Sequence, residues 1–214
     1  PSFLGFGTMN GKDGKPFKTR EGGVMRLENL IADIDEEMFT KIVENRSVRD
    51  KDARDTAKIV GLAAIKYGDL SNQATKDYIF DVDRFTSFEG NTGPYILYTI
   101  VRIKSILNRY VEAGGNLEAG EILPASNGSE KNLMLQLSGF GSMIESAFEE
   151  KAPHKICAYI YEVSNAFNSF YHETKILSEE NQAQKESYIR LLQLTKRVLE
   201  TSIDLLGFEA PDKM

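Results

Sequence analysis

The sequence of 214 residues has no tryptophan, one cysteine and two histidines. A single cysteine, Cys157, excludes an internal disulfide and any metal site built on paired cysteines. Cys157 stands beside Ala158 and Ile160 in an apolar stretch with helical spacing, which favours an inert core thiol over a nucleophile. This cysteine usage fits a protein of the reducing cytoplasm, and we expect a cytoplasmic location.

Long hydrophobic runs are also missing. No apolar stretch approaches the roughly 18 residues that span a bilayer, so no membrane segment is expected. The first residues, Pro1–Gly5, include neither a methionine nor a charged region, and they show no signal peptide. Because the sequence opens in an apolar, glycine-rich run typical of a strand interior, we expect a segment of a longer protein.

A basic excess is absent too. The formal net charge is −6, which argues against a general nucleic-acid binder, although local patches matter more than the sum. With 41% hydrophobic residues, the chain can bury a core. Two predicted helices carry cations that form either a basic face or ordinary solvated surface: Arg102, Lys104 and Arg109 on one, and Lys185, Arg190, Lys196 and Arg197 on the other.

Hydrophobic spacing predicts a mainly helical chain that begins with a short strand. The strand is expected over 3–8. The predicted helices span residues 27–43, 50–67, 95–111, 129–149, 153–172 and about 181–206. Ser129 and Ser178 are the expected N-caps of two of them, and Gly207 should end the last. The last four helices are long and amphipathic and have short polar connections, so they predict a bundle.

The segment 11–23 combines turn-forming glycines with four basic and two acidic residues. Lysines on such a loop can close over an anion such as pyrophosphate and stabilise charge on a leaving group. A solvated surface hairpin explains the same pattern, and charge alone leaves both interpretations open.

Lys15-Pro16-Phe17-Lys18-Thr19 resembles the Lys-Met-Ser-Lys-Ser signature of class I aminoacyl-tRNA synthetases, in the form found in the arginyl-tRNA synthetase family. Both lysines are kept, and Pro16-Phe17 replaces Met-Ser. The resemblance implies that Lys18 acts on the ATP phosphates during arginine activation, that Lys15 supports it, and that Thr19 also borders the ATP.

The resemblance extends over almost the whole chain. It includes residues 60–71, 77–84 and 88–95, of which Glu89-Gly90-Asn91-Thr92-Gly93-Pro94 is the most specific string. We expect that string to form an interdomain joint in which Glu89 and Asn91 cap the next helix, and a direct role in ligand binding is the alternative. Residues 166–171 and 205–214 resemble the anticodon-binding domain of the same family.

One motif of the family is missing from these residues. Class I enzymes hold ATP with a His-x-Gly-His motif, but His154 and His172 stand in no such motif. We therefore expect the ATP-binding half and the arginine pocket upstream of Pro1. His154 is interpreted as an exposed helix-start residue, and for His172 surface placement competes with RNA contact.

The predicted fold is thus mainly α. Residues 1–91 would form the last strand, signature loop and helices of a Rossmann-like catalytic domain, and residues 92–214 an anticodon-binding helical bundle. The parent enzyme would join arginine to its tRNA with ATP and Mg²⁺ and is expected to be a monomer. No residue here is predicted to bind the metal. A stand-alone tRNA- or protein-binding module derived from a synthetase is the alternative.

The anticodon is expected to dock at Asn168, Tyr171 and Met214. Tyr171 ends an apolar helical stripe and offers a ring and a hydroxyl, and Asn168 lies three residues earlier on the same face. Pro211 prevents the tail from continuing the helix, so the tail should fold back with Met214 against a base. The alternative is that Tyr171 covers the core and the tail frays.

Overall fold

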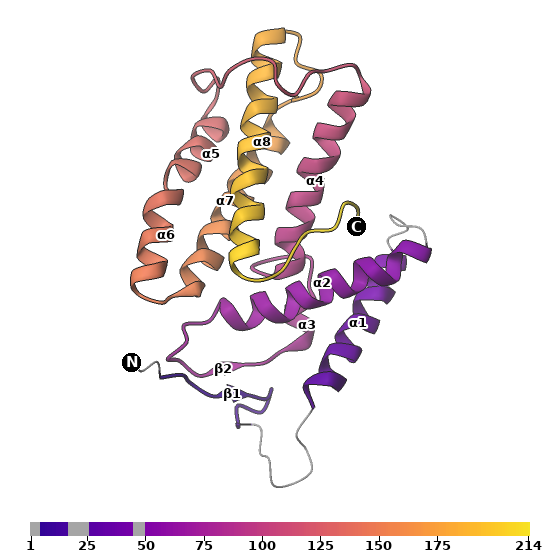
Figure 1. Cartoon of the computed structure of the whole chain (residues 1–214), viewed down its shortest axis with the longest axis vertical. Helices are drawn as coiled ribbons and strands as arrows, with labels where there is room; N and C mark the ends of the chain where they lie inside the picture. Colours follow the sequence, from indigo (N-terminus) through magenta and orange to yellow (C-terminus); the bar gives the residue numbers. More distant parts are fainter. Residues whose placement is uncertain (1–4, 17–25, 45–49) are drawn as a thin grey trace.

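The computed structural model describes residues 5–16, 26–44 and 50–214, and within them the chain is mainly helical, as predicted. A bundle formed by the last five helices stands above a helix pair and a small sheet (Figure 1). In chain order the elements are β1 (Met9–Asn10), α1 (Leu27–Glu44), α2 (Asp50–Leu70), β2 (Tyr78–Ile79), α3 (Val82–Phe85), α4 (Gly93–Glu112), α5 (Gly128–Ser138), α6 (Phe140–Glu149), α7 (Pro153–Glu173) and α8 (Gln182–Leu205).

The described sheet has two parallel strands, with Met9 opposite Tyr78 and Asn10 opposite Ile79. The strand predicted over 3–8 is wrong in position, because the described residues 5–8 have no regular structure. Gly7 instead donates its N–H to Ala74 O at 2.8 Å and lies so close to the backbone of Lys76 that a Cβ would clash. Strand pairing therefore starts only at Met9.

α1 and α2 pack along each other and form the arm at the right of Figure 1. The buried residues of α1 recur every fourth position, at Leu30, Ile34, Met38 and Ile42. Leu27 and Ile31 continue the apolar spacing of this helix in the sequence, but they are 63% and 38% exposed. Both lie in the first turns of α1, which project beyond α2 (Figure 1).

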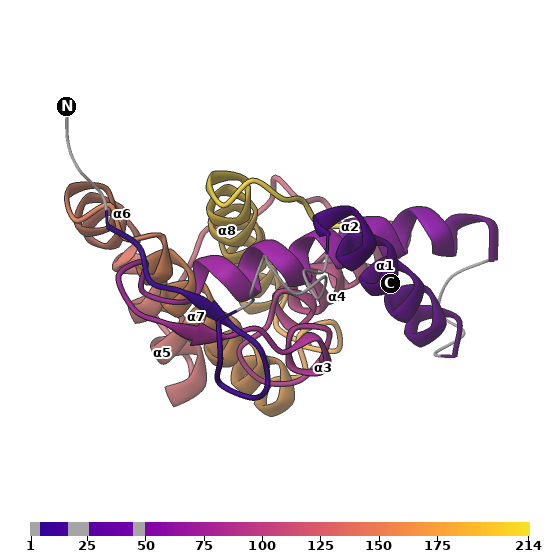
Figure 2. The same cartoon turned by 90° about the horizontal axis from the view of Figure 1, so that it is seen from below.

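α2 also crosses the lower end of the bundle, as Figures 1 and 2 show, and packs against α4 and α7. At this joint Gly93 lies so close to Ala63 that an added Cβ would be 2.4 Å from its carbonyl oxygen. The fully buried Tyr67 of α2 donates to Asn91 Oδ1 at 2.5 Å or to Cys157 O of α7 at 2.8 Å. The joint therefore connects α2, the connector before α4, and α7.

Several predicted helix starts are corrected. Thr92, rather than Glu89 or Asn91, caps α4 by accepting from Tyr95 N at 3.2 Å. The helix predicted over 129–149 is two helices separated at Gly139, and its cap is Asn127 rather than Ser129. α8 begins after Asn181, which caps it in place of Ser178.

The end of α8 was predicted correctly. Gly207 has φ +81° and terminates the helix. The tail from Gly207 then turns back across α4, as the yellow trace in Figure 1 shows, so it does not extend the helix. No helix in the described ranges is long and apolar enough to cross a membrane.

Candidate functional site

The hairpin at Asn10–Pro16 forms the described part of the predicted signature loop. Gly11 N donates to Lys15 O at 2.9 Å, Gly14 adopts φ +73°, and Asn10 and Pro16 form an antiparallel bridge. The side chain of Lys15 is exposed. Lys18 and Thr19 lie outside the described residues, so the structure places only one of the three predicted loop residues.

Lys12 attaches this hairpin to the start of α3. Its Nζ lies 2.5 Å from Asp83 Oδ2 and 3.3 Å from Asp81 Oδ1. The hydrogen bond to Asp83, and then that to Asp81, raises the pKa of Lys12, while the same lysine lowers the pKa of Asp83. Lys12 and Asp83 are both exposed, so their ion pair orients the loop base more than it stabilises the fold.

Asn168 and Tyr171 of α7 meet at a single arginine of α4. Arg102 Nη1 donates to Asn168 Oδ1 at 2.7 Å, and its Nη2 donates to Tyr98 Oη at 3.1 Å. The guanidinium carbon lies 4.7 Å from the centroid of the Tyr98 ring and 5.1 Å from that of Tyr171. Both distances are within the range of cation–π attraction. We call Tyr98, Arg102, Asn168 and Tyr171 the arginine cluster.

The amide of Asn168 is fully engaged inside the protein. Its Nδ2 donates to Tyr95 Oη at 2.8 Å, and Tyr95 in turn donates to Asn165 Oδ1 at 2.7 Å. Burial raises the pKa of Tyr95, which keeps its hydroxyl protonated for that bond. Asn168 therefore holds Arg102 in place and has no free amide group to offer a ligand.

Tyr98 and Tyr171 form the outer surface of the arginine cluster. Tyr98 is 41% exposed, and Tyr171 is half-buried, with its ring stacked on Phe167 at a centroid distance of 6.1 Å. Each ring thus has support from the protein and an edge or face toward solvent. An aromatic ring beside a fixed guanidinium can stack a flat base and donate hydrogen bonds to it.

The C-terminal tail is held on α4 by Lys104, which is 15% exposed at its side chain. Lys104 Nζ lies 3.3 Å from Ala210 O, 3.2 Å from Pro211 O and 3.3 Å from Asp212 Oδ1. Lys66 of α2 donates to Gly207 O at 2.6 Å and fixes the start of the tail. Met214 is half-buried and packs against the core.

The three predicted RNA-binding residues therefore do not form one compact corner. At about 100° per residue, Lys104 lies about 200° around α4 from Arg102. The tail is attached on one side of α4, while Asn168 and Tyr171 lie on the other. Tyr98 and the exposed Arg109 lie within about 40° of Arg102 around α4, on the side of Asn168 and Tyr171.

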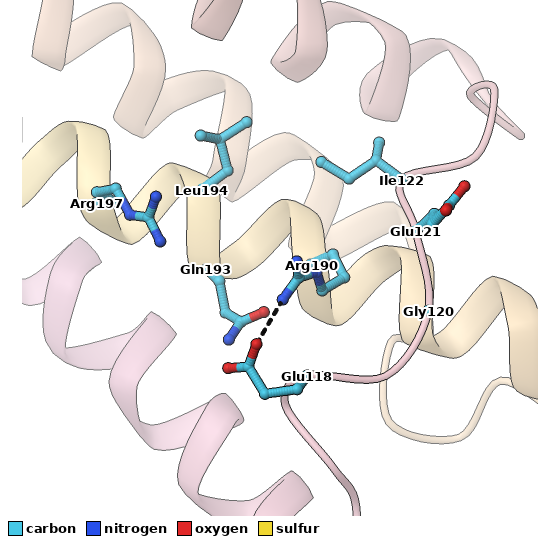
Figure 3. A pocket seen from close by; sticks show the side chains of 8 residues that line it. All are labelled: Glu118, Gly120, Glu121, Ile122, Arg190, Gln193, Leu194 and Arg197. Atoms are coloured by element: carbon cyan, nitrogen blue, oxygen red, sulfur yellow. Dashed lines mark ion pairs between the residues drawn. The ribbon is translucent and has the colours of Figure 1, made fainter.

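Three of the seven cations predicted for the two basic faces form ion pairs. Lys104 and Lys196 share Glu200, at 3.7 and 2.8 Å, and Arg190 lies 3.5 Å from Glu118 (Figure 3).

Sequence reasoning included Arg102 only as one cation among several, and it missed Tyr98. The spacing of four residues between them was the available signal, because such positions adjoin on a helix.

Cys157 is fully buried, and burial raises its pKa to about 12, which confirms its interpretation as a core thiol. His172 is exposed, whereas His154 is partly buried, so its interpretation as an exposed residue is wrong. The described residues contain no group of three or more His, Cys, Asp or Glu side chains placed to hold a metal ion.

Comparison with known families divides the chain into two matched parts. Residues 96–214 match the DALR anticodon binding domain, and residues 2–82 match the class I (R) tRNA synthetase catalytic domain. The first match covers more than half of the chain.

Similar proteins of known sequence carry a consistent description. The arginine–tRNA ligase of Agathobacter rectalis is 67% identical over 99% of the chain, and that of Alkaliphilus oremlandii is 57% identical over 99%. The chain spans 37% and 36% of the length of these two relatives.

Two solved structures have the same fold. The arginyl-tRNA synthetase of Thermus thermophilus gives a TM-score of 0.83 at 25% identity, covering 97% of this chain and 34% of that one. The arginyl-tRNA synthetase of Plasmodium falciparum gives 0.80 at 26% identity, covering 99% and 35%.

Proposed function

Because the chain belongs to the arginyl-tRNA synthetase family, we propose that it forms part of an arginine–tRNA ligase. In this proposal residues 1–91 complete the catalytic domain and contribute its signature loop. Residues 92–214 are the anticodon-binding domain. The gap between the two family matches, residues 83–95, contains the proposed boundary.

The reaction of the whole enzyme would have two steps. The arginine carboxylate attacks the α-phosphate of ATP, which gives arginyl-adenylate and releases pyrophosphate. A terminal ribose hydroxyl of the tRNA then attacks the arginyl carbonyl and releases AMP. Lys15, Lys18 and Thr19 are assigned to the ATP phosphates, where lysine ammonium groups stabilise the charge that develops on pyrophosphate. Mg²⁺ would enter with ATP, and since the described residues offer no ligand set for it, no step is assigned to it.

The arginine cluster is the observation that carries the tRNA-binding part of the proposal. Anticodon bases are unpaired, and proteins recognise such bases by stacking and by hydrogen bonds to their edges. Tyr98 and Tyr171 supply the stacking surfaces, and Arg102 supplies the donors. Asn168 acts as a positioning residue that fixes Arg102. Met214 is assigned a second contact with the tRNA, from the tail that Lys104 holds on the other side of α4.

Removing one stacking ring gives a direct test. In the full-length enzyme, Tyr171→Ala should raise KM for arginine tRNA by the equivalent of about 1–3 kcal/mol. Phe148→Ala is the matched control, because Phe148 is an aromatic residue of α6 that is 83% exposed. Deletion of 211–214 should also raise KM. The assignment fails if Tyr171→Ala and the deletion both match Phe148→Ala while the fold is intact by circular dichroism.

The runner-up is a stand-alone tRNA- or protein-binding module derived from a synthetase. The reading frame upstream of Pro1 distinguishes the two, because only the ligase requires a His-x-Gly-His motif there. The ligase is further proposed to act in the cytoplasm as a monomer, and the free thiol of Cys157 in this chain fits a reducing compartment. Sedimentation of the full-length protein with and without tRNA measures the oligomeric state.

A further inference from the structure

The short helix α3 contacts the segments on both sides of the signature loop. The hairpin at Asn10–Pro16 leads into the loop, and α1 follows it in the chain. The N-cap residue Asp81 and the first-turn residue Asp83 of α3 bind the hairpin, while Thr86 at its C-terminal end binds α1. α3 itself packs against α2. It is therefore placed to fix where the loop begins and how the helix after it lies.

On the hairpin side, the contact depends on one residue. Residues 11–15 close their turn with their own backbone hydrogen bonds, and the stem before them pairs with β2. Within the part of the chain that the structure describes, Lys12 makes the only ion pairs and hydrogen bonds from 11–15 to residues outside the hairpin. Its partners are the carboxylates of Asp81 and Asp83, so without Lys12 the turn is held by its stem alone.

On the α1 side, the contact is a partly buried network around Thr86, which is itself fully buried. Lys41 Nζ donates to Thr86 O at 3.2 Å and to Thr86 Oγ1 at 2.9 Å, and it lies 2.7 Å from Glu37 Oε1. Glu37 Oε1 also lies 2.6 Å from Thr86 Oγ1. Such a network fixes α1 on α3 more firmly than an exposed pair could, because it is less screened by solvent.

The two lysines of the described hairpin differ in what surrounds their charge. Lys12 is met by two carboxylates, and a phosphate brought to its ammonium group would approach those negative charges as well. Lys15 is exposed and forms no ion pair with any described residue. Lys15 is thus suited to an anion such as a phosphate, whereas the charge of Lys12 is already used within the protein.

We propose that Lys12 is a positioning residue for arginine activation. By binding Asp81 and Asp83 it holds the turn of the hairpin on α3, and this sets the point from which Lys15 and the rest of the signature loop reach the ATP phosphates. Small displacements of a group that stabilises the transition state lower the rate, so the position of the turn affects the reaction although Lys12 touches no reactant. The inference rests on the proposed function, because it takes residues 15–19 as the loop that acts on ATP.

The first test is single-turnover formation of arginyl-adenylate by the full-length enzyme with saturating ATP, arginine and tRNA. Lys12→Ala should slow this step by about threefold to fivefold, the factor that corresponds to an exposed ion pair. A lysine that binds the phosphates directly would give a loss of about 10²–10³. Lys12→Arg keeps the charge and should restore most of the rate. KM for arginine tRNA should be unchanged in both variants, which separates positioning of the loop from a general loss of structure.

A double-mutant cycle then asks whether Lys12 acts through α3. Asp83→Ala should slow adenylate formation in the wild-type background, by no more than Lys12→Ala does, because Asp81 is still present. In the Lys12→Ala background the same substitution should have no further effect, since the partner of Asp83 is already gone. Glu36→Ala is the matched control, because it breaks an ion pair of the same length, 2.5 Å, between two exposed side chains, Glu36 of α1 and Arg54 of α2.

Three results would overturn the proposal. They are a rate for Lys12→Ala equal to that of Glu36→Ala, a loss of 10²–10³ in Lys12→Ala, and an effect of Asp83→Ala that is equally large in both backgrounds. The proposed function has its own test at this loop, because Lys18→Ala must slow the same step if residues 15–19 act on ATP. A slow Lys18→Ala with an unaffected Lys12→Ala would refute only the positioning role.

Discussion

Gly93 at the joint between α2 and α4 gives the sharpest stability prediction. A Cβ at this position would lie 2.4 Å from Ala63 O, 2.6 Å from Ala63 C and 3.1 Å from Ala64 N. Ordinary contact begins near 3.4 Å, and the obstructing atoms are backbone, so α2 and α4 must separate by about 1 Å. Overpacking of this kind costs about 1–3 kcal/mol. Gly93→Ala should therefore lower the melting temperature by about 2–12 °C, since each kcal/mol shifts a domain of this size by about 2–4 °C.

The same substitution at Gly141 is the control. Gly141 lies in α6, and an added Cβ there meets nothing within 4 Å. Because alanine is a better helix former than glycine, Gly141→Ala should leave stability unchanged or raise it by up to about 1 kcal/mol. Thermal and urea unfolding followed by circular dichroism measure both variants. Equal stability of the Gly93→Ala and Gly141→Ala proteins would refute the close approach of the two helices, and with it the geometry of the joint.

Three further predictions concern the core and the signature loop. Burial raises the pKa of the Cys157 thiol from 9.0 to about 12, so its stabilising contribution is complete below pH 9 and is lost as pH rises toward 12. The urea midpoint of the wild type should fall as pH rises from 9 to 12, and it should fall less in Cys157→Ala, which has no thiol to ionise. Labelling of the native protein by iodoacetamide at pH 8 would contradict the burial of Cys157. In the full-length enzyme, Lys18→Ala should slow single-turnover adenylate formation by about 10²–10³ with little change in arginine binding, and an unchanged rate would remove Lys18 from the phosphate site. The 214-residue chain alone should show only background exchange of pyrophosphate into ATP, because its sequence lacks the His-x-Gly-His motif, and measurable exchange by pure chain would disprove this.

Local signals in the sequence were sufficient for most helices. Buried residues at helical spacing, such as Ile34 and Met38, define one face of α1 without reference to the rest of the chain. A terminating glycine works the same way, because the positive φ of Gly207 is a property of its own backbone. The resemblance carried by Lys15–Thr19 was similarly local, and the family comparison agrees with it.

Competition between neighbouring residues decided the helix starts. Thr92, Asn127 and Asn181 each cap a helix near another plausible capping residue, and sequence gives no strong preference among adjacent polar side chains. Gly139 lies inside an otherwise helical pattern, where a glycine is either tolerated or ends a helix depending on packing.

The candidate site depended on tertiary structure. Tyr98 and Arg102 are neighbours on α4, but their meeting with Asn168 and Tyr171 joins positions about 70 residues apart, and only the packing of α4 on α7 creates it. The same packing uses both amide groups of Asn168, which changes its proposed role from base contact to positioning. Sequence therefore determined which helices form and which residues carry suitable chemistry, because those are local properties. Which side chains meet, and which remain free for a ligand, was decided by how the helices pack, because hydrogen bonds and ion pairs form between the nearest available partners.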